Sequence, residues 1–342
     1  MKDMEQRKVM SLGRSSLVIS LPKHWTKLNE LKQGDVVSLA VQRDRSLVVF
    51  PGAGRKKGSR EITLHIDPDE RAAMIVRSII ACYLNGYSGI RLVSKKIFPV
   101  PQQRAIRRIV RILYMRIMES DSKSMHITTL IDESKASVIS GIQRMHMIAN
   151  SMCRDVLNSL RDQDATLAKT VYSLDDDVDH FSFFILRLLR RATLDPTLAN
   201  QLDLEPIDCL DLQTLVHRIE QVADSATNIA KHMIMLNQRR LRISERLIEL
   251  MMNAGNTSAS CYGEAVEAYF SGDTANSDEI IEQEKSIESM DRKIASWSFL
   301  HEKKNPVIVC ATCSIRESIT RIAEYAADIA EITINRSYKP KS

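Results

Sequence analysis

Acidic side chains recur at helical spacing in the second half of the sequence. Asp175 and Asp179 lie four positions apart, and so do Glu220 and Asp224. Residues at this spacing share one helix face, and each like-charged pair destabilises its helix by about 0.2–0.5 kcal/mol. Both pairs border an apolar seam, so two such ridges that converge beside a core favour either a bound cation or basic partners. The alternatives to a cation are a solvated flank or pairing with Arg187, Arg190 or Arg218.

Long amphipathic helices must position these ridges. Apolar residues after Ser134 recur at three- and four-residue steps, which is typical of antiparallel bundles. The segment 218–230 resembles 318–330, with Ala-acid-x-Ala-x-Asn/Asp-Ile-Ala in both. The sequence therefore predicts an internal duplication, with three-helix bundles over 134–238 and 243–338. The six helices are expected at 135–162, 164–193, 208–237, 243–271, 277–301 and 307–335.

Residues 60–132 alternate between strand and helix patterns and predict a βαβαβ unit without a phosphate-binding glycine motif. The expected elements are, in order, a strand at 62–66, a helix at 69–85, a strand at 89–93, a helix at 102–119 and a strand at 126–131.

Residues 1–52 read as a small β domain. A strand is expected at 17–21, a single helical turn at 22–25, and a hairpin formed by 36–41 and 46–50. Residues 51–59, rich in Gly, Lys and Arg, form a predicted linker.

Charge separates these parts. Residues 1–58 hold twelve Lys/Arg against five Asp/Glu, a local excess of +7, although the whole chain carries only +5. A basic N-terminal segment joined to a mildly acidic C-terminal part predicts that only the N-terminal segment binds a polyanion. The basic series Arg104, Arg107, Arg108 and Arg111 could also lie on a phosphate backbone, but a solvated helix face is the favoured interpretation.

The remaining composition is that of a cytoplasmic globular protein. Apolar residues make up 44% and charged residues 27% of the 342 positions, and no apolar run approaches the ~18 residues of a membrane span. We therefore expect no membrane insertion, and reduced cysteines. Cys310 and Cys313 are expected to be small core residues of a helix rather than zinc ligands. No catalytic motif is present, so an enzyme is not expected.

The first 51 residues resemble the AbrB/SpoVT/MazE swapped-hairpin DNA-binding domain. The resemblance lies in Arg7-Lys8-Val9, Gly13-Arg14-Ser15-Ser16, the run from Val18 to Lys23, and Leu31-Lys-x-Gly-Asp35. It implies an interleaved homodimer, because each short chain cannot close its own barrel. It also implies contacts to double-stranded DNA, and the candidate residues are Arg7, Lys8, Arg14, Ser15, Ser16 and Lys23.

Residues 134–338 resemble the PhoU phosphate-uptake regulators, which are built from two three-helix repeats. The resemblance lies in Asp175-x-x-x-Asp179 and Glu220-x-x-x-Asp224, with Glu284-x-x-x-Glu288 and Glu324 as counterparts. It implies a metal ion at these positions, of identity Fe, Mn, Mg, Ca or Zn. Thr320 stands where the counterpart of Glu220 belongs, so the second site is expected to be weaker, with Asp328 and Asp291 as further carboxylates.

The combination of the two families is similar to an archaeal arrangement. It implies a mainly α, multidomain protein with a small N-terminal swapped-hairpin β-barrel, a central βαβαβ unit and a C-terminal pair of three-helix bundles. The expected function is a dimeric, DNA-binding and metal-binding transcriptional regulator of phosphate uptake. The alternative is an adaptor that does not bind DNA and that inhibits a phosphate ABC transporter, through its ATPase, or a signalling kinase.

Overall fold

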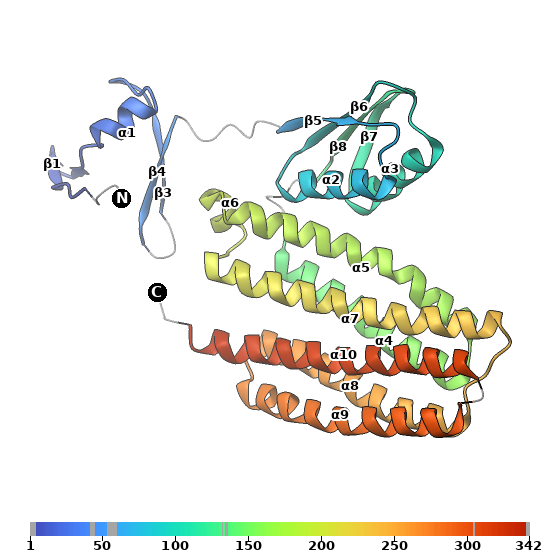
Figure 1. Ribbon diagram of the computed structural model, residues 1–342. Coiled ribbons are helices and arrows are strands. Elements are labelled where there is room, and N and C mark those ends of the chain that lie inside the picture. Colours follow the sequence, from blue (N-terminus) through green and yellow to red (C-terminus); the bar gives the residue numbers. More distant parts are fainter. Residues whose placement is uncertain are drawn as a thin grey trace. The chain divides into compact units, whose positions relative to one another are not determined.

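The structure, a computed structural model, describes residues 5–41, 45–52, 60–131, 133, 136–303 and 305–339. Contacts within the chain divide it into two units, residues 1–59 and residues 60–342 (Figure 1). The tip of the predicted hairpin at 42–44 and most of the predicted linker lie outside the described residues. No described helix is long and apolar enough to cross a membrane.

The first unit consists of two small hairpins and one short helix. Strands β1 (Met10–Leu12) and β2 (Ser16–Val18) pair antiparallel, α1 (Lys23–Leu28) follows, and β3 (Val37–Val41) pairs with β4 (Leu47–Pro51). The predicted second hairpin is therefore confirmed. The predicted strand at 17–21 begins earlier and is shorter, because it pairs with β1 across the turn at Gly13.

The first unit has no core of its own. None of its described residues is buried. Ten large apolar side chains are at least 48% exposed, among them Leu17 at 74%, Leu39 at 60% and Val41 at 68%. Apolar β surface on this scale needs a covering layer to be stable in water.

The central part of the second unit is a four-stranded sheet covered on one face by two helices (Figure 1). Its elements are, in order, β5 (Glu61–Ile66), α2 (Ala72–Leu84), β6 (Gly89–Ser94), α3 (Val100–Ile112), β7 (Met115–Ser120) and β8 (Ser124–Thr129). The strand order is β5-β6-β8-β7, with β5 parallel to β6 and the other pairs antiparallel. Ile75, Ile79 and Ile106 on the helices pack on Ile90 and Ile127 of the sheet.

The predicted helix over 102–119 is wrong in its second half. Helix α3 ends at Ile112, Tyr114 takes a left-handed φ of 51°, and residues 115–120 form the extra strand β7. Alternating burial at the start of this segment, with Met115 buried and Arg116 exposed, has the two-residue period of a strand. The unit is therefore βαβαββ.

The remainder of the chain is a bundle of long helices, as predicted. The helices are α4 (Val138–Asp162), α5 (Ala165–Ala192), the short α6 (Pro196–Gln201), α7 (Pro206–Gln238), α8 (Glu245–Ser271), α9 (Thr274–His301) and α10 (Pro306–Ser337). Five of these seven begin on an Asp, Asn or Ser side chain that accepts a backbone N–H, which is the usual way to satisfy the first turn.

The expectation for Cys310 and Cys313 is wrong, since both are exposed. Helix α10 buries Ile308, Ala311 and Ile315, which turns the two cysteines to the opposite side.

Two contacts between α7 and α10 join pairs of positions that are equivalent in the internal repeat. Asn228 donates a hydrogen bond to Ser318 at 2.9 Å, and Arg218 pairs with Asp328 at 2.8 Å. At the 100-residue offset these are the same two positions with the roles of the repeats exchanged. The repeats therefore meet with approximate two-fold symmetry along this helix pair.

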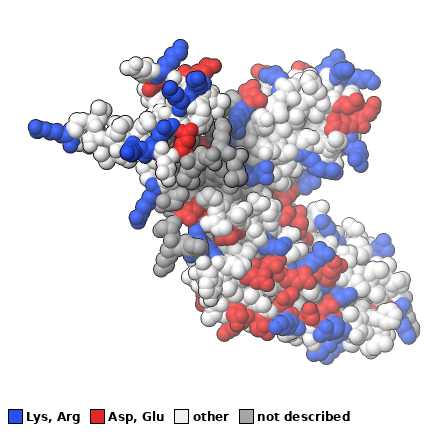
Figure 2. Space-filling view, turned by 60° about the vertical axis from the view of Figure 1, so that its left-hand side comes forward, with Lys and Arg blue, Asp and Glu red and all other residues white. Residues whose placement is uncertain are grey.

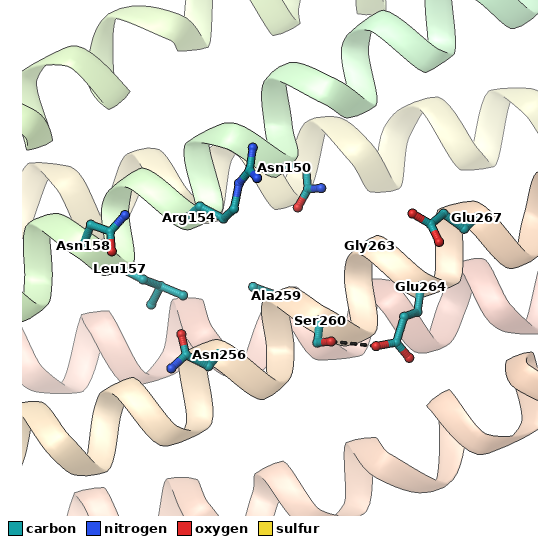
Figure 3. Close-up of a pocket in the computed structure, with 10 residues that line it drawn as sticks. All are labelled: Asn150, Arg154, Leu157, Asn158, Asn256, Ala259, Ser260, Gly263, Glu264 and Glu267. Carbon is teal, nitrogen blue, oxygen red and sulfur yellow. Dashed lines mark hydrogen bonds between the residues drawn. The ribbon is translucent and has the colours of Figure 1, made fainter.

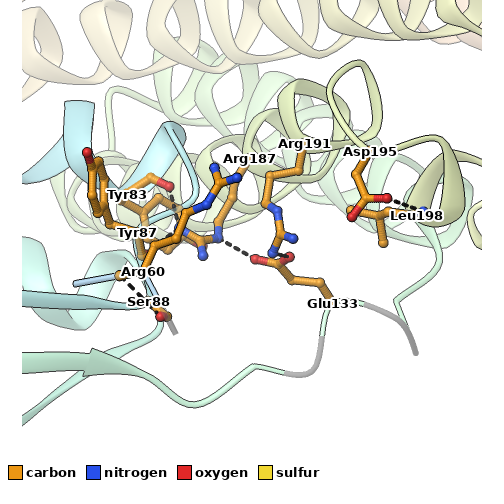
Figure 4. A network of polar contacts seen from close by, with 9 residues as sticks. All are labelled: Arg60, Tyr83, Tyr87, Ser88, Glu133, Arg187, Arg191, Asp195 and Leu198. Carbon is orange, nitrogen blue, oxygen red and sulfur yellow. Dashed lines mark hydrogen bonds and ion pairs between the residues drawn. The ribbon is translucent and has the colours of Figure 1, made fainter. Parts of the chain in front are cut away.

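A buried ionic network fastens the central domain to α5 (Figure 4). The guanidinium of Arg187 is 2% exposed, donates to Glu133 at 2.6 Å and to the carbonyl of Tyr87 at 2.9 Å, and lies 4.7 Å from the ring centroid of Tyr83. Arg191 also pairs with Glu133. Because a buried charge without a partner is costly, this network fixes where the central domain sits on the bundle.

We expect Arg187→Ala to lower the free energy of unfolding by about 3–5 kcal/mol, since it leaves Glu133 buried without its main partner. Arg190, the neighbour of Arg191 on the same helix, is exposed, and among the described residues its side chain donates only to Asn85. Arg190→Ala should therefore change the free energy of unfolding by less than about 0.5 kcal/mol. Urea unfolding of both variants measures this. Equal losses would mean that the network does not hold the domain.

Candidate functional site

The four acidic residues of the first repeat meet where α5 packs on α7. Helix α5 supplies Asp175 and Asp179, and α7 supplies Glu220 and Asp224. Burial and the neighbouring carboxylates Asp175 and Asp224 raise the pKa of Asp179 to about 7. Burial, then Asp224 and Asp179, raise the pKa of Glu220 to about 7 as well. The two predicted ridges therefore converge into one acidic cluster.

Few cations balance this cluster. Burial raises the pKa of Asp175 and Asp224, and Lys231 offsets only part of that rise. Arg108 reaches across from α3 to pair with Asp176 at 2.6 Å. The hydroxyl of Thr227 donates to Asp175 at 3.1 Å. On the bundle face in Figure 2, acidic side chains gather with basic ones between them.

The arginines that could have neutralised the cluster bind elsewhere. Arg187 pairs with Glu133, Arg190 with Asn85, and Arg218 with Asp328 across the repeats. Pairing of the first-repeat ridges with these three side chains, one of the alternatives to a cation, is therefore wrong.

The second repeat carries a looser counterpart of the cluster. The pKa of Glu284 is raised by burial, and then by Glu324, Glu288 and Asp328, so the structure brings these four together. Glu288 and Glu324 are exposed. Asp328 is paired with Arg218, and Glu288 lies 3.7 Å from Arg292.

Asp291 does not join the second cluster. Both of its carboxylate oxygens accept from Arg316, at 2.7 and 2.6 Å. This departs from the expectation that Asp291 could supply a further carboxylate there.

The donors of both clusters fit an oxygen-preferring cation in kind, because they are all carboxylates. Their spacing is not yet that of a closed site: among the described residues, no three His, Cys, Asp or Glu side chains stand close enough together to hold a metal ion. Side-chain rotation toward a cation would be needed, which half-exposed residues allow.

The candidate DNA contacts are all exposed and come from three places in the first unit. Arg14 and Ser15 occupy the β1–β2 turn, in which Gly13 takes a φ of 72° that an L side chain rarely adopts, and Ser16 opens β2. Lys23 begins α1. Arg7 and Lys8 precede β1, where Arg7 is paired with Glu5.

Sequence reasoning missed a polar groove of about 460 Å³ between α4 and α8, the first helices of the two repeats (Figure 3). Three asparagines point into it, Asn150 and Asn158 from α4 and Asn256 from α8. A Cβ added at Gly263 would lie 3.9 Å from the amide nitrogen of Asn150. The signal in the sequence that could have indicated this groove is the set of asparagines on these two helices.

Comparison with known families decides the assignment of the bundle. The PhoU domain matches the chain twice, over residues 142–233 and 237–333, which is more than half of its length. The chain belongs to the PhoU domain family. Residues 11–73 match a second family, the antidote-toxin recognition MazE bacterial antitoxin, so the resemblance of the N-terminal segment is also confirmed.

This PhoU chain matches three PhoU proteins over nearly the full length of each of them. A phosphate-specific transport system accessory protein PhoU homologue from Clostridium acetobutylicum is 22% identical over 226 residues, 64% of this chain and 93% of the relative. PhoU from Pseudomonas aeruginosa superposes with a TM-score of 0.52 at 20% identity, over 59% of this chain and 96% of that structure. PhoU from Streptococcus pneumoniae gives 0.50 at 15%, over 59% and 94%. These structures share the fold of the helical repeats.

With a chelator present, we expect the contribution of the first cluster to stability to fall as pH rises from 5 to 8. The folded pKa values of about 7 at Asp179 and Glu220 lie above the unfolded values near 4, so the folded state holds protons that the unfolded chain has released. That stability is complete at low pH and is lost as pH rises through 7.

Glu220→Gln removes one of these groups and should flatten the pH dependence of the free energy of unfolding, measured by urea unfolding at pH 5 to 8. Glu279→Gln, at an exposed position of α9, is the matched control and should keep the wild-type slope. The same slope for Glu220→Gln and wild type would contradict the convergence of the ridges.

Proposed function

We propose that this PhoU-family protein is a dimeric, DNA-binding regulator of phosphate uptake, whose helical repeats bind metal ions. The observation that carries the proposal is one chain with two matches: a PhoU domain in duplicate and an antitoxin-type domain at the N-terminus. The phosphate-specific transport role named for the Clostridium relative supports the pathway.

The DNA-binding part of the proposal rests on charge and shape in the first unit. Its first 58 residues carry an excess of +7, and the β1–β2 turn presents Arg14 beside the short Ser15 and Ser16 side chains. A turn of small residues lets a phosphate approach the backbone closely, and an arginine can fork onto a phosphate or a guanine edge.

Dimerisation follows from the missing core. A domain of about 50 residues buries too little apolar surface to be stable alone. In this unit, none of the described residues is buried. A second copy of the same segment offers the matching apolar strands, so each subunit completes the other. Two copies also double the basic surface that a duplex meets.

The full-length protein should bind duplex DNA, and Arg14→Ala should weaken that binding at least about tenfold, as expected for the loss of one good arginine contact. Lys27→Ala, which removes an exposed cation from the end of α1, is the matched control and should cost less. Fluorescence anisotropy with genomic fragments from phosphate-transporter promoters measures both. Wild-type affinity in the Arg14 variant would show that the turn is not the contact.

The metal-binding part of the proposal rests on the acidic clusters. Asp175, Asp179, Glu220 and Asp224 would hold the ion in the first repeat, and Glu284, Glu288, Glu324 and Asp328 would hold a weaker one in the second. Burial and then the neighbouring carboxylates raise the pKa values of Asp179 and Glu220, and a bound cation would supply positive charge that stabilises their ionised forms. Carboxylate ligands favour Mn, Mg, Ca or Fe over tetrahedral zinc.

Added Mn²⁺ or Mg²⁺ should raise the melting temperature of the chelator-treated protein by mass action. Asp179→Asn with Glu220→Gln should abolish most of the rise, whereas Glu284→Gln should leave most of it in place. Scanning calorimetry at several metal concentrations is the measurement. If wild type never gains stability from any of these ions, the clusters are solvated carboxylates.

The alternative function is an adaptor that acts on a transporter ATPase or a signalling kinase without binding DNA. The name of the Clostridium relative, an accessory protein of phosphate-specific transport, supports this alternative. In that case the first unit serves only to dimerise. A dimeric protein with no DNA affinity at low salt would decide for the adaptor.

A further inference from the structure

Helix α3 of the central domain displays a row of arginines for which the proposed function gives no role. Its buried side chains, among them Ile106, Ile109 and Val110, pack under the sheet. Arg104, Arg107, Arg108 and Arg111 are all exposed and lie on the other side of the helix.

The positive charge of this row is not balanced within the helix. The thirteen residues of α3 include four arginines and no acidic residue. Like charges at three- and four-residue spacing destabilise a helix by about 0.2–0.5 kcal/mol per pair. Only Arg108 has a partner, Asp176 of α5; the other three form no ion pair with any residue in the described part of the chain. A solvated face of the ordinary kind would interleave acidic residues.

The row stands on a rigid support. Buried Gln102, in the first turn of α3, donates to the carbonyls of Asp67, Pro68 and Glu70 at 2.9–3.1 Å. The central domain is in turn fixed to α5 by the Arg187 network. Because the backbone of this helix is already fixed, only the arginine side chains themselves lose conformational entropy when they bind a partner.

The charge of the whole central domain identifies the kind of partner. Residues 60–131 contain twelve Lys/Arg and six Asp/Glu, a net +6, and they follow directly on the basic first unit. Arginine is the side chain best suited to bidentate phosphate contact. Positions 104, 107 and 111 span about 10 Å of helix, a length over which one strand of a duplex presents about three phosphates.

We propose that Arg104, Arg107 and Arg111 form a second contact to double-stranded DNA, on the phosphate backbone flanking the sequence that the first unit binds. The inference rests on the proposed DNA-binding function and adds a second surface to it. Because these side chains meet phosphates, they contribute affinity and salt dependence but no base preference.

The test is the salt dependence of DNA affinity in the full-length protein. Arg104→Gln, Arg107→Gln and Arg111→Gln are combined in one variant, and anisotropy is measured with a 40-base-pair duplex at several salt concentrations. Each lost phosphate contact reduces the slope of log affinity against log salt by about 0.9. The slope should therefore become shallower by about 3 if the arginines of one subunit contact DNA, and by about 5 if those of both subunits do. The melting temperature should not fall, because no ion pair is lost.

A second triple variant controls for bulk charge. Arg239→Gln, Arg240→Gln and Arg242→Gln remove three exposed arginines from the α7–α8 connection. This variant should keep the wild-type slope. An unchanged slope in the α3 variant, or an equal change in both variants, would overturn the proposal.

The two levels of proposal fail differently. Wild type that binds no duplex at low salt would overturn the DNA-binding function itself. If wild type binds DNA and Arg14→Ala weakens that binding, but the α3 variant keeps the wild-type salt dependence, the DNA-binding function is supported and only the second contact is wrong.

Discussion

The apolar side chains of the first unit are not buried by the unit's own described residues, and this deficit is the constraint on which the proposed assembly of the protein depends. Ten large apolar residues there are at least 48% exposed, and no described residue of the unit is buried. Hydrophobic burial is the main favourable contribution to folding, so such a unit is stable only when a second surface covers it. In the function that we propose, a second copy of the chain is the partner that covers it.

The second unit shows the opposite situation, because polar contacts, of which the Arg187 network is buried, join its parts. Arg187 joins the central domain to α5, and the pairs Asn228–Ser318 and Arg218–Asp328 join the two repeats. Helix α5 also carries Asp175 and Asp179. Helix α5 therefore both contributes two carboxylates to the acidic cluster and supports the central domain, and Arg108 of α3 pairs with Asp176 of the same helix.

The sequence was sufficient for features that repeat. Helical periodicity located the six long helices within a few residues, and the 100-residue offset predicted the duplication, whose two copies meet through α7 and α10. The four-residue spacing within each acidic pair placed Asp175 with Asp179 and Glu220 with Asp224 on one helix face each, and burial together with neighbouring carboxylates raises the pKa of Asp179 and of Glu220 to about 7.

Features that depend on tertiary context could not be obtained in this way. Residues 115–120 are apolar enough for either period, and their pairing with β8 decides for a strand. Cys310 and Cys313 are small residues in an apolar helix, and only the packing of α10 shows which side faces solvent. The partner of Arg187 was invisible because Glu133 lies in a connecting segment outside any periodic pattern.

Sedimentation equilibrium of the full-length protein tests the central claim most directly, because it reports whether the first unit draws two chains together. The account predicts a mass of twice 38.8 kDa at micromolar concentration, and half that mass after Leu39→Glu places a charge on the uncovered face of β3. A wild-type protein that sediments as a single chain, with its N-terminal segment folded, would contradict it.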